Sequence, residues 1–260
     1  MLLAKRDGAA LRVTLNRPEV RNAFDEDVIA AVTQVFRAAA LQKDLRAVVV
    51  RGAGKDFCAG ADVRWMKRAA GYGPARNKKD ALRLAAMCRA IDDCPVPVLA
   101  GVQGSCFGGG LGIVAACDVV AAAENAVLSF SECRLGILPA VVSSFVLPKI
   151  GPAQARRYFL TAETFGAAAA QRIGLVHEVA PEAELDAKLE GLLAWVLRGG
   201  PQAVREAKAL IRRAAPLPLE RRIPLTVATL ARVRSSPEGK EGLSAFLEKR
   251  PAAWVPAKGP

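Results

Sequence analysis

Hydrophobic and polar positions along most of this chain follow two periods, one typical of helices and one of buried strands. After Asp25, apolar residues recur at helical spacing, and the aspartate side chain is expected to cap that helix. Continuously apolar runs of strand length occupy residues 47–54 and 95–104, and a long helix is predicted over 74–94. This alternation indicates an α/β protein built from stacked strand–helix units.

Shorter features add elements to this outline. Residues 11–24 predict a strand followed by a turn, and Asp62 is placed to cap a further helix. Residues 117–130 predict two short strands around a turn at 124–125. The first three quarters of the chain therefore contain both kinds of element in alternation.

The last quarter has a different pattern. Residues 183–247 are helical in periodicity, with breaks at 199–201 and 216–218, where glycine and proline gather. We therefore expect residues 1–198 to form the core that carries the chemistry. Residues 199–260 are expected to form a helical C-terminal subdomain.

The composition fits a large folded unit rather than a disordered chain. Of 260 residues, 52% are hydrophobic and 24% are charged, so a sizeable core can be buried. The net charge is +12, but it is scattered, and aromatic residues, at 5%, offer few stacking platforms for nucleic acid. The charge suits an anionic, phosphorylated ligand, or it is simply a basic surface.

The cysteines give no sign of a disulfide framework or of a metal site. Six are present, without a CxxC pair or a His/Cys metal spacing, and most lie in apolar context. We expect free, buried thiols in a reducing cytoplasm. Residues 1–20 lack the apolar stretch of a secretory signal, and no apolar run is long enough to span a membrane.

Two short segments, "CAGAD" (58–62) and "GGG" (108–110), share a design. Each follows an apolar strand and places small residues where a helix begins. Small residues let a ligand approach the backbone, and helix N-termini leave N–H groups unpaired. Two such groups aimed at one point make an oxyanion hole. The alternative is a pair of tight turns that only pack closely.

Several segments, in order between about residues 10 and 254, together resemble the enoyl-CoA hydratase/isomerase (crotonase) family. The resemblance implies a spiral of strand–strand–helix (ββα) units with a helical C-terminal region through which subunits form trimers, usually paired as hexamers. The segments are "NRPEVRNAF", "FCAGADVRWM", "GVQGSCFGGG", "ACDVV", "SECRLGILPA", "GPAQARRYFLTAETFGAAAAQRIGLVHEV" and "EGLSAFLEKRPAAW".

The resemblance also implies where an acyl-CoA thioester binds. Its enolate oxygen is expected to be held by the backbone N–H groups of Ala61 and Gly109. The stretch from Ala61 through Asp62 and Val63 to Arg64 is similar to the one that contacts the adenosine part of CoA.

The C-terminal end of the resemblance bears on CoA as well. Phe246 and Lys249 match positions that contact CoA, in many members from a neighbouring subunit; the alternative is an ordinary amphipathic helix end. CoA arrives as part of the substrate. Neither a metal nor a redox cofactor is expected, because the chemistry is polarisation plus proton transfer.

Hydratases of this family commonly use two glutamates, and only one is present here. "SECRLGILP" (131–139) places Glu132 at one family position, and its apolar neighbours are expected to raise its pKa. The other position holds Gly112. The resemblance therefore leaves two activities: hydration with a single glutamate, or double-bond migration as in Δ3-Δ2 enoyl-CoA isomerases.

The segments around the site look closest to bacterial 3-methylglutaconyl-CoA and isohexenylglutaconyl-CoA hydratases, which also have glycine two residues after the "GGG" segment. Their substrates carry a second carboxylate, which Arg64, Lys67 or Tyr72 is placed to reach. Dienoyl-CoA isomerases are set aside, because Ala140 stands where they have an aspartate. A non-catalytic, RNA-binding relative is a further rival, supported only by the charge.

The remaining chemistry-bearing residues are interpreted as structural. His177 is the only histidine, and no serine or cysteine has the context of a nucleophile that it would activate. Asp118 is expected to pair or to cap. Cys58 and Cys106 lie beside the two donor turns and are expected to fill space.

Overall fold

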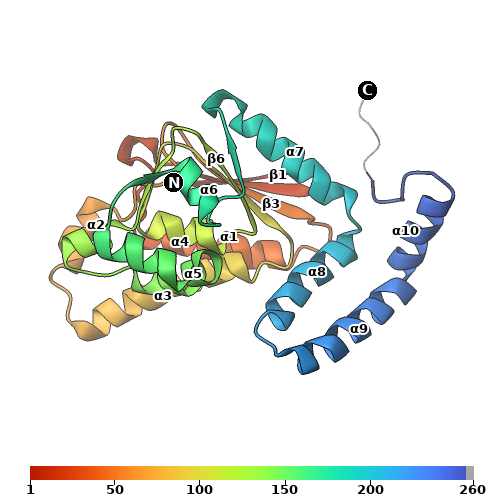
Figure 1. Ribbon diagram of the computed structural model, residues 1–260. Coiled ribbons are helices and arrows are strands. Elements are labelled where there is room, and N and C mark those ends of the chain that lie inside the picture. Colours follow the sequence, from red (N-terminus) through yellow and green to blue (C-terminus); the bar gives the residue numbers. More distant parts are fainter. Residues whose placement is uncertain (256–260) are drawn as a thin grey trace.

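The computed structural model describes residues 1–255, so the end of the predicted C-terminal subdomain lies outside the described residues. Its main feature is a six-stranded sheet (Figure 1), and a second sheet has three strands. The first pair of the main sheet is antiparallel and the rest are parallel. The main sheet has the order β1 (Leu2–Asp7), β2 (Ala10–Leu15), β3 (Ala47–Gly52), β4 (Val98–Val102), β6 (Val119–Ala123) and β9 (Glu178–Ala180); the small sheet has the order β5 (Ser105–Phe107), β7 (Val127–Ser129) and β8 (Phe165–Gly166).

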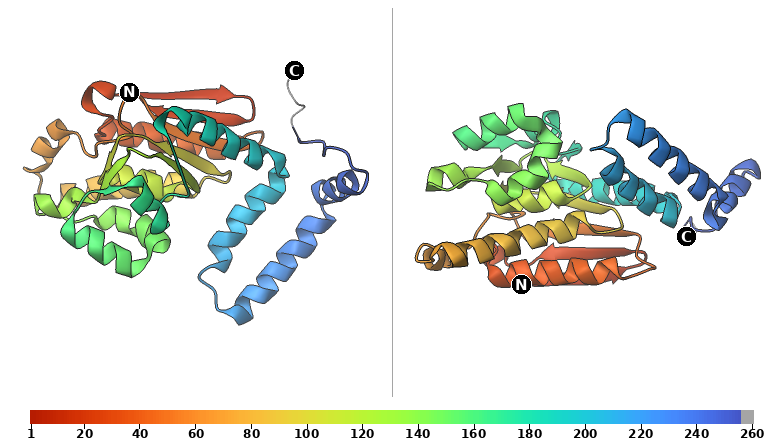
Figure 2. Two further views of the ribbon diagram at one scale, coloured as in Figure 1. Left: turned by 45° about the horizontal axis from the view of Figure 1, so that its top comes forward. Right: turned by 90° about the horizontal axis from the view of Figure 1, so that it is seen from below.

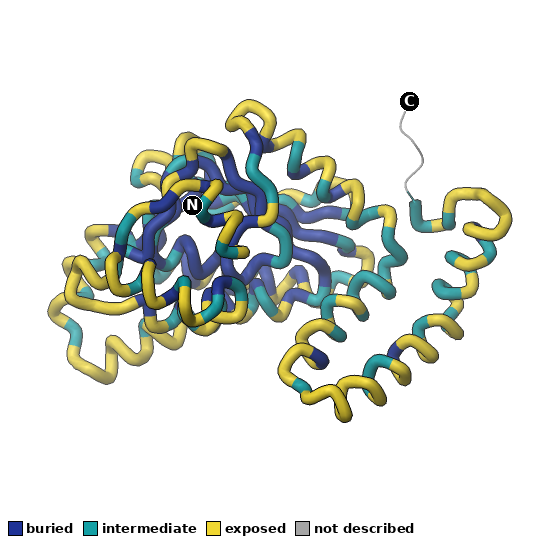
Figure 3. The backbone as a smooth tube through the Cα atoms, in the orientation of Figure 1, coloured by how far each residue is buried: buried dark blue, intermediate teal, exposed yellow. Residues whose placement is uncertain are grey.

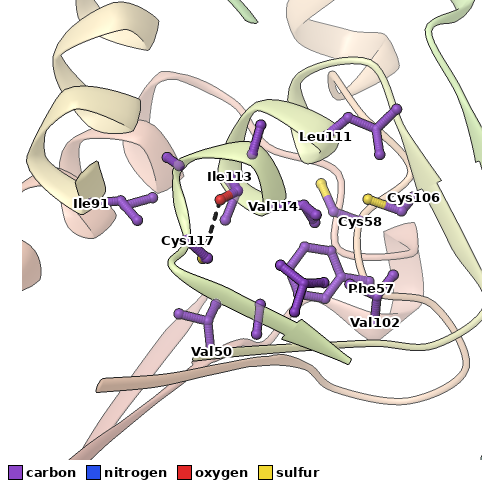
Figure 4. Close-up of a cluster of buried hydrophobic side chains, with 14 of the residues drawn as sticks. Val50, Phe57, Cys58, Ile91, Val102, Cys106, Leu111, Ile113, Val114 and Cys117 are labelled. Atoms are coloured by element: carbon purple, nitrogen blue, oxygen red, sulfur yellow. Dashed lines mark hydrogen bonds between the residues drawn. The ribbon is translucent and has the colours of Figure 1, made fainter. Parts of the chain in front are cut away.

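The inner strands of the main sheet are buried on both faces, which explains why they are continuously apolar. On β3, Val48 and Val50 belong to one hydrophobic cluster, and Ala47 and Val49 belong to another on the opposite face. Figure 4 shows part of the first cluster, including buried cysteines. The helices around the first cluster are α1 (Glu26–Ala40), α3 (Pro74–Asp92), α4 (Gly109–Ala116) and α5 (Ala140–Thr161), and α7 (Leu185–Arg198) covers the second.

The chain repeats a strand–strand–helix unit, with one strand in each sheet. β4, β5 and α4 form one such unit, and β6, β7 and α5 form the next. An earlier unit runs from β3 through an isolated parallel bridge at Cys58 to α2 (Val63–Ala69). The predicted α/β fold of stacked ββα units is therefore confirmed.

Both helix caps predicted from the sequence are confirmed. The Asp25 carboxylate accepts hydrogen bonds from the backbone N–H groups of Asp27 and Val28, and Asp62 accepts one from Arg64. The pattern did not predict β1, which is a largely exposed edge strand, or β5 and β9, which are three residues long. Strands that are this short or this polar show no clear alternation of apolar and polar positions in the sequence.

The helical C-terminal region stands away from the sheet-containing body (Figures 1 and 2), and most of it is exposed (Figure 3). Its breaks fall at the predicted glycine and proline positions. The Arg46 guanidinium fixes its base by donating to the carbonyls of Leu197, Gly199 and Trp254. We call its helices the arm: α8 (Pro201–Ala214), α9 (Leu219–Ser235) and α10 (Pro237–Leu247).

The shorter helical elements connect these parts. None of the helices within residues 1–255 is long and apolar enough to cross a membrane. The connecting elements are α6 (Ala167–Arg172) and three 3₁₀ helices, Pro18–Val20, Ser131–Leu135 and Glu182–Glu184.

Candidate active site

A cavity of about 250 Å³ lies where three successive ββα units turn into their helices. It brings together the residues that the sequence assigned to catalysis: Ala61 before α2, Gly109 at the start of α4, and Glu132 on the 3₁₀ helix that precedes α5. Its walls are otherwise mostly apolar. The lining consists of Ala59, Gly60, Ala61, Trp65, Met66, Ala69, Gly108, Gly109, Ser131, Glu132, Leu135 and Ile137.

The register of the small sheet explains why residues so far apart in sequence meet. Cys58 is bridged to Cys106, and Cys106 pairs with Leu128 of β7. Ala61 and Gly109 each follow their bridged cysteine by three residues, and Glu132 follows Leu128 by four. The three residues therefore occupy equivalent places in successive units.

A backbone bridge to Phe24 fixes the direction of the Ala61 N–H. The Phe24 N–H donates to the Gly60 carbonyl (2.9 Å), and the Asp62 N–H donates to the Phe24 carbonyl (2.8 Å). In an extended chain, successive peptide groups point to opposite sides. The Ala61 N–H thus points away from Phe24, and within residues 1–255 it has no acceptor.

Gly109 offers the second donor. It is the first residue of α4, so its N–H has no partner inside the helix. Gly108 turns the chain into that helix at φ +50°, a conformation that favours glycine. A Cβ on Gly109 would collide with the Phe24 ring, so Phe24 contacts both donor segments.

Glu132 presents its carboxyl group beside Gly108. Its Oε1 lies 3.4 Å from where a Cβ on Gly108 would stand. Its Oε2 is buried and has no hydrogen-bond partner in the described part of the chain. Desolvation raises the pKa of Glu132 above its ordinary value of 4.5, the direction expected from its apolar sequence neighbours.

Gly112 lies on the buried side of α4, where there is no room for a side chain. A Cβ there would stand 2.7 Å from Val142 Cγ1 of α5 and 3.2 Å from Cys88 Sγ of α3. Val142 therefore closes the space into which a second acid at position 112 would project.

The segment expected to contact CoA is divided between buried and exposed residues. Asp62 is buried, caps α2 and pairs with Arg17 (2.7 Å), whereas Val63 and Arg64 are exposed on the first turn of α2. Phe246 is 81% exposed at the end of the arm. Neither it nor Lys249 lines the cavity of this subunit.

The side chains expected to reach a second substrate carboxylate do not line the cavity either. Arg64 and Lys67 are at least partly exposed on α2. The guanidinium of Arg76 stacks over the Tyr72 ring, with its central carbon 3.7 Å from the centre of that ring. The cavity wall thus contains no cationic side chain.

The structural interpretation of His177 and Asp118 is confirmed. His177 Nδ1 accepts the backbone N–H of Val120 at 3.0 Å. Asp118 accepts the N–H of Val98 at 2.7 Å and the Lys208 ammonium at 2.6 Å.

All six cysteines are free, as expected, and all except Cys133 are buried. Burial raises the pKa of the Cys58 thiol to about 12, so it is not a nucleophile at neutral pH. Within residues 1–255, no group of three or more His, Cys, Asp or Glu side chains is arranged to hold a metal ion.

The sequence did not single out Phe24 or Trp65. Phe24 contacts both donor segments, and Trp65 lines the cavity at a ring-centroid distance of 6.1 Å from Phe24. Phe24 was visible only as part of "NRPEVRNAF". Trp65 reads as an apolar residue of a short helix, and nothing in its spacing indicates a polar environment.

A spiral of ββα units with two backbone donors and a half-buried carboxyl group defines an enzyme of the crotonase type. A family profile described as "Enoyl-CoA hydratase/isomerase" matches residues 5–256. The chain belongs to this family.

Relatives and solved structures agree with this assignment. A crotonyl-CoA hydratase of Syntrophomonas wolfei is 30% identical over 262 residues, covering 98% of this chain and 97% of the relative. The crystal structure of an enoyl-CoA hydratase from Shewanella pealeana matches with TM-score 0.93 at 35% identity, over 97% of this chain and 95% of that one. Pseudomonas aeruginosa AtuE matches with TM-score 0.94 at 34% identity, over 98% and 99%.

Proposed function

We propose that this protein is a hydratase that adds water to the double bond of an α,β-unsaturated acyl-CoA. The observation that carries the proposal is the meeting of Ala61, Gly109 and Glu132 at one small cavity. Within residues 1–255, two N–H groups without acceptors face a site that also holds a half-buried carboxyl group. Relatives named as hydratases support the same activity.

The chemistry needs charge stabilisation and two proton transfers. The N–H groups of Ala61 and Gly109 hold the thioester oxygen as it becomes an enolate; loss of one such donor typically costs about 3 kcal/mol. The Glu132 carboxylate takes a proton from water while the water oxygen bonds to Cβ. It then gives that proton to Cα as the enolate electrons return, which restores the carboxylate and completes the addition of water.

CoA binds, in this proposal, along the start of α2 and against a second copy of the chain. Ala61 to Arg64 contact the adenosine part, and Phe246 and Lys249 contact CoA from a neighbouring subunit. The support is geometric: α2 and the tip of the arm lie at opposite ends of one subunit (Figure 1). The assembly is a trimer or a dimer of trimers. No metal or redox cofactor takes part.

The acyl group that we propose is 3-methylglutaconyl or a close analogue. The support is the glycine at position 112, shared with the hydratases that this sequence resembles. Leu135 and Ile137 form an apolar, exposed side of the cavity that suits a branched carbon chain. The same missing acid supports the second candidate, a Δ3-Δ2 enoyl-CoA isomerase that uses Glu132 alone.

A turnover panel tests the activity and the substrate together. Purified protein is incubated with crotonyl-CoA, 3-methylglutaconyl-CoA and a 3-enoyl-CoA, and the products are separated by chromatography. We expect 3-hydroxyacyl-CoA products, with kcat/KM about tenfold or more higher for 3-methylglutaconyl-CoA than for crotonyl-CoA.

The other outcomes identify the rivals. Migration of the double bond without any 3-hydroxyacyl product identifies an isomerase. No turnover, combined with salt-sensitive retention of RNA, identifies a non-catalytic RNA-binding protein. Equal turnover of crotonyl-CoA and 3-methylglutaconyl-CoA contradicts the proposal of a dicarboxylic acyl group, but it is still consistent with a hydratase.

A further inference from the structure

Trp65 lies in the wall of the cavity and carries a polar group that the catalytic scheme does not use. It lies on the first turn of α2 and lines the cavity with Glu132 and Gly109. Its indole N–H is buried and has no acceptor within residues 1–255. A buried donor without a partner costs free energy, so such groups in folded proteins call for an explanation.

The other buried, unpartnered side-chain atoms of the described residues divide into two kinds. Arg51 has one unpaired nitrogen and Gln103 an unpaired oxygen, but each side chain also has a paired nitrogen, which bonds to Asp186 in Arg51 and to the Gly52 carbonyl in Gln103. Trp65 has a single polar atom, and it is unpaired. The remaining atom is Glu132 Oε2. The side chains that carry the lone donor and the lone acceptor therefore both line one cavity.

We propose that the Trp65 indole N–H is a positioning donor for the water that adds to Cβ, and that this water in turn donates to Glu132. The inference rests on the proposed hydratase function. It answers the question raised by Gly112, because the chain has no second carboxyl at that place and Val142 fills the space.

The division of labour follows from what each group can do. An indole N–H donates and cannot accept a proton, so it orients the water but does not activate it. Glu132 breaks the water O–H bond and takes that proton, the water oxygen bonds to Cβ, and the displaced electron pair moves to the thioester oxygen. Glu132 then returns the proton to Cα. Trp65 is unchanged throughout, so the balance is that of a simple addition of water.

Ser131 is the other side chain in the wall that carries a hydrogen-bonding group. Within residues 1–255 its hydroxyl has no hydrogen-bond partner and is not among the buried atoms, so solvent water already reaches it. Among the described residues of the wall, Trp65 and Glu132 are the two with a buried polar atom that lacks a hydrogen bond, and a water held between them would supply both bonds.

The test separates water addition from proton exchange at Cα. Trp65→Phe keeps an aromatic ring and removes the N–H. We expect kcat/KM for hydration of both crotonyl-CoA and 3-methylglutaconyl-CoA to fall about tenfold or more. Exchange of the Cα protons of butyryl-CoA with D2O uses the two backbone donors and Glu132 but adds no water, so it should stay within about twofold. Trp195→Phe, at a tryptophan that is 69% exposed on α7, is the matched control and should change neither rate.

Several results would overturn the inference. These are unchanged hydration in Trp65→Phe, an equal loss of hydration and exchange, a loss confined to crotonyl-CoA, and a selective loss of hydration in Ser131→Ala instead. A wild-type protein that hydrates no enoyl-CoA refutes the proposed function itself, so the two failures are distinguishable.

A second measurement does not require the Trp65 variant to fold. The protein has three tryptophans, and Trp195→Phe and Trp254→Phe assign their indole N–H resonances, which leaves the third to Trp65. Binding of a 3-hydroxyacyl-CoA product puts a hydroxyl oxygen where the water added. The Trp65 indole proton should then move downfield, and an unmoved resonance contradicts the proposal.

Discussion

At the scale of single residues, the catalytic scheme depends on one carboxyl whose surroundings disfavour its charge. Glu132 has a buried oxygen without a partner, and burial raises its pKa. A more basic carboxylate takes a proton from water more readily, and its acid form is still strong enough to give the proton to Cα. The desolvation that favours this proton transfer also lowers the stability of the folded protein when Glu132 is ionised.

Glu132→Gln should therefore lose activity and change the pH dependence of stability. We expect hydration to fall at least about a hundredfold, the usual scale for a general acid or base. Below pH 4.5, the wild-type carboxyl is protonated whether the chain is folded or unfolded, so burial has little cost. As pH rises from 4.5 through the raised folded-state pKa, the unfolded chain ionises first and the wild type loses stability.

The melting temperatures of Glu132→Gln and the wild type, compared between pH 4 and 7.5, check this sign. The difference should shift in favour of the variant as pH rises. A difference independent of pH would mean that Glu132 is not desolvated, and near-normal hydration would mean that it is not the acid–base group.

The resemblance to the family indicated Glu132, and its apolar neighbours along the chain predicted the direction of its pKa shift. That second prediction was possible because neighbours such as Leu135 and Ile137 also line its cavity. The sequence did not predict that Phe24 and Trp65 contribute to the site. Phe24 reaches the site through a bridge to Ala61, and Trp65 through the short helix α2. These contacts depend on strand register and on helix direction, and neither can be read from apolar spacing.

At the scale of elements, the spiral of ββα units builds the site by repetition. The bridge at Cys58 and the pairing of Cys106 with Leu128 align three strand ends. Each end leads into a helix whose first residues face the cavity. Two of the units contribute backbone N–H groups there, and the third contributes a side chain.

The packing of α4 against α5 explains the glycine in the middle of α4. If Val142 excludes a side chain at 112, then Gly112→Ala overpacks this contact, at a cost of about 1–3 kcal/mol. Val142→Ala should relieve that cost. A double-mutant cycle by urea unfolding should therefore give a favourable coupling of at least about 1 kcal/mol between the two substitutions, since the helix propensity of alanine cancels in the cycle.

Gly191 on α7 provides the matched control, because a Cβ there meets no atom within 4 Å. Gly191→Ala should stabilise the protein by about 0.5–1 kcal/mol through helix propensity alone. Additive effects of Gly112→Ala and Val142→Ala would show that the two residues are not in tight contact.

At the scale of the whole molecule, the arm leaves an apolar surface uncovered. Large apolar side chains on α9 and α10 are more than half exposed. In a monomeric protein such a surface is a liability, and a second copy of the chain is the partner that we propose for it. These side chains are Leu219, Ile223, Val227, Leu230, Leu243, Phe246 and Leu247.

Phe246→Glu should therefore weaken assembly. Light scattering at micromolar concentration should give the mass of a trimer or hexamer for the wild type and a smaller species for the variant, because a charge replaces buried apolar area. Leu160→Glu, at a residue that is 75% exposed near the end of α5, serves as the control and should keep the wild-type mass. A monomeric wild type would refute the proposed assembly.

The basic charge is less available than the composition suggests. On and near the arm, arginines pair with acids: Arg212 with Asp93, Arg232 with Glu206, and Arg250 with Glu241. Exposed pairs of this kind add little stability, but they lower the local positive potential. This pairing is a further argument against the hypothesis that the protein binds nucleic acid.

Most of the α/β order and the helical end could be predicted from the sequence, because buried parallel strands and capped helices leave strong local signals. Residues close together in the sequence determine several features of the fold. These are the helix caps at Asp25 and Asp62, the strand at 47–54 and the breaks near 199–201 and 216–218. The small sheet as a whole could not be predicted. Residues 117–130 did predict the short strand β7 after the turn at 124–125, but β5 and β8 are three and two residues long and owe their existence to pairing between units.

The backbone origin of two of the three proposed catalytic groups has a consequence for mutational surveys. An alanine scan removes side chains, yet position 61 is already alanine and position 109 has no side chain to remove. Substitution at Gly109 would report a collision with Phe24, and the survey would record a packing defect. Replacing single amide bonds by esters, which delete one N–H and keep every side chain, is the perturbation that would show what these two peptide groups contribute.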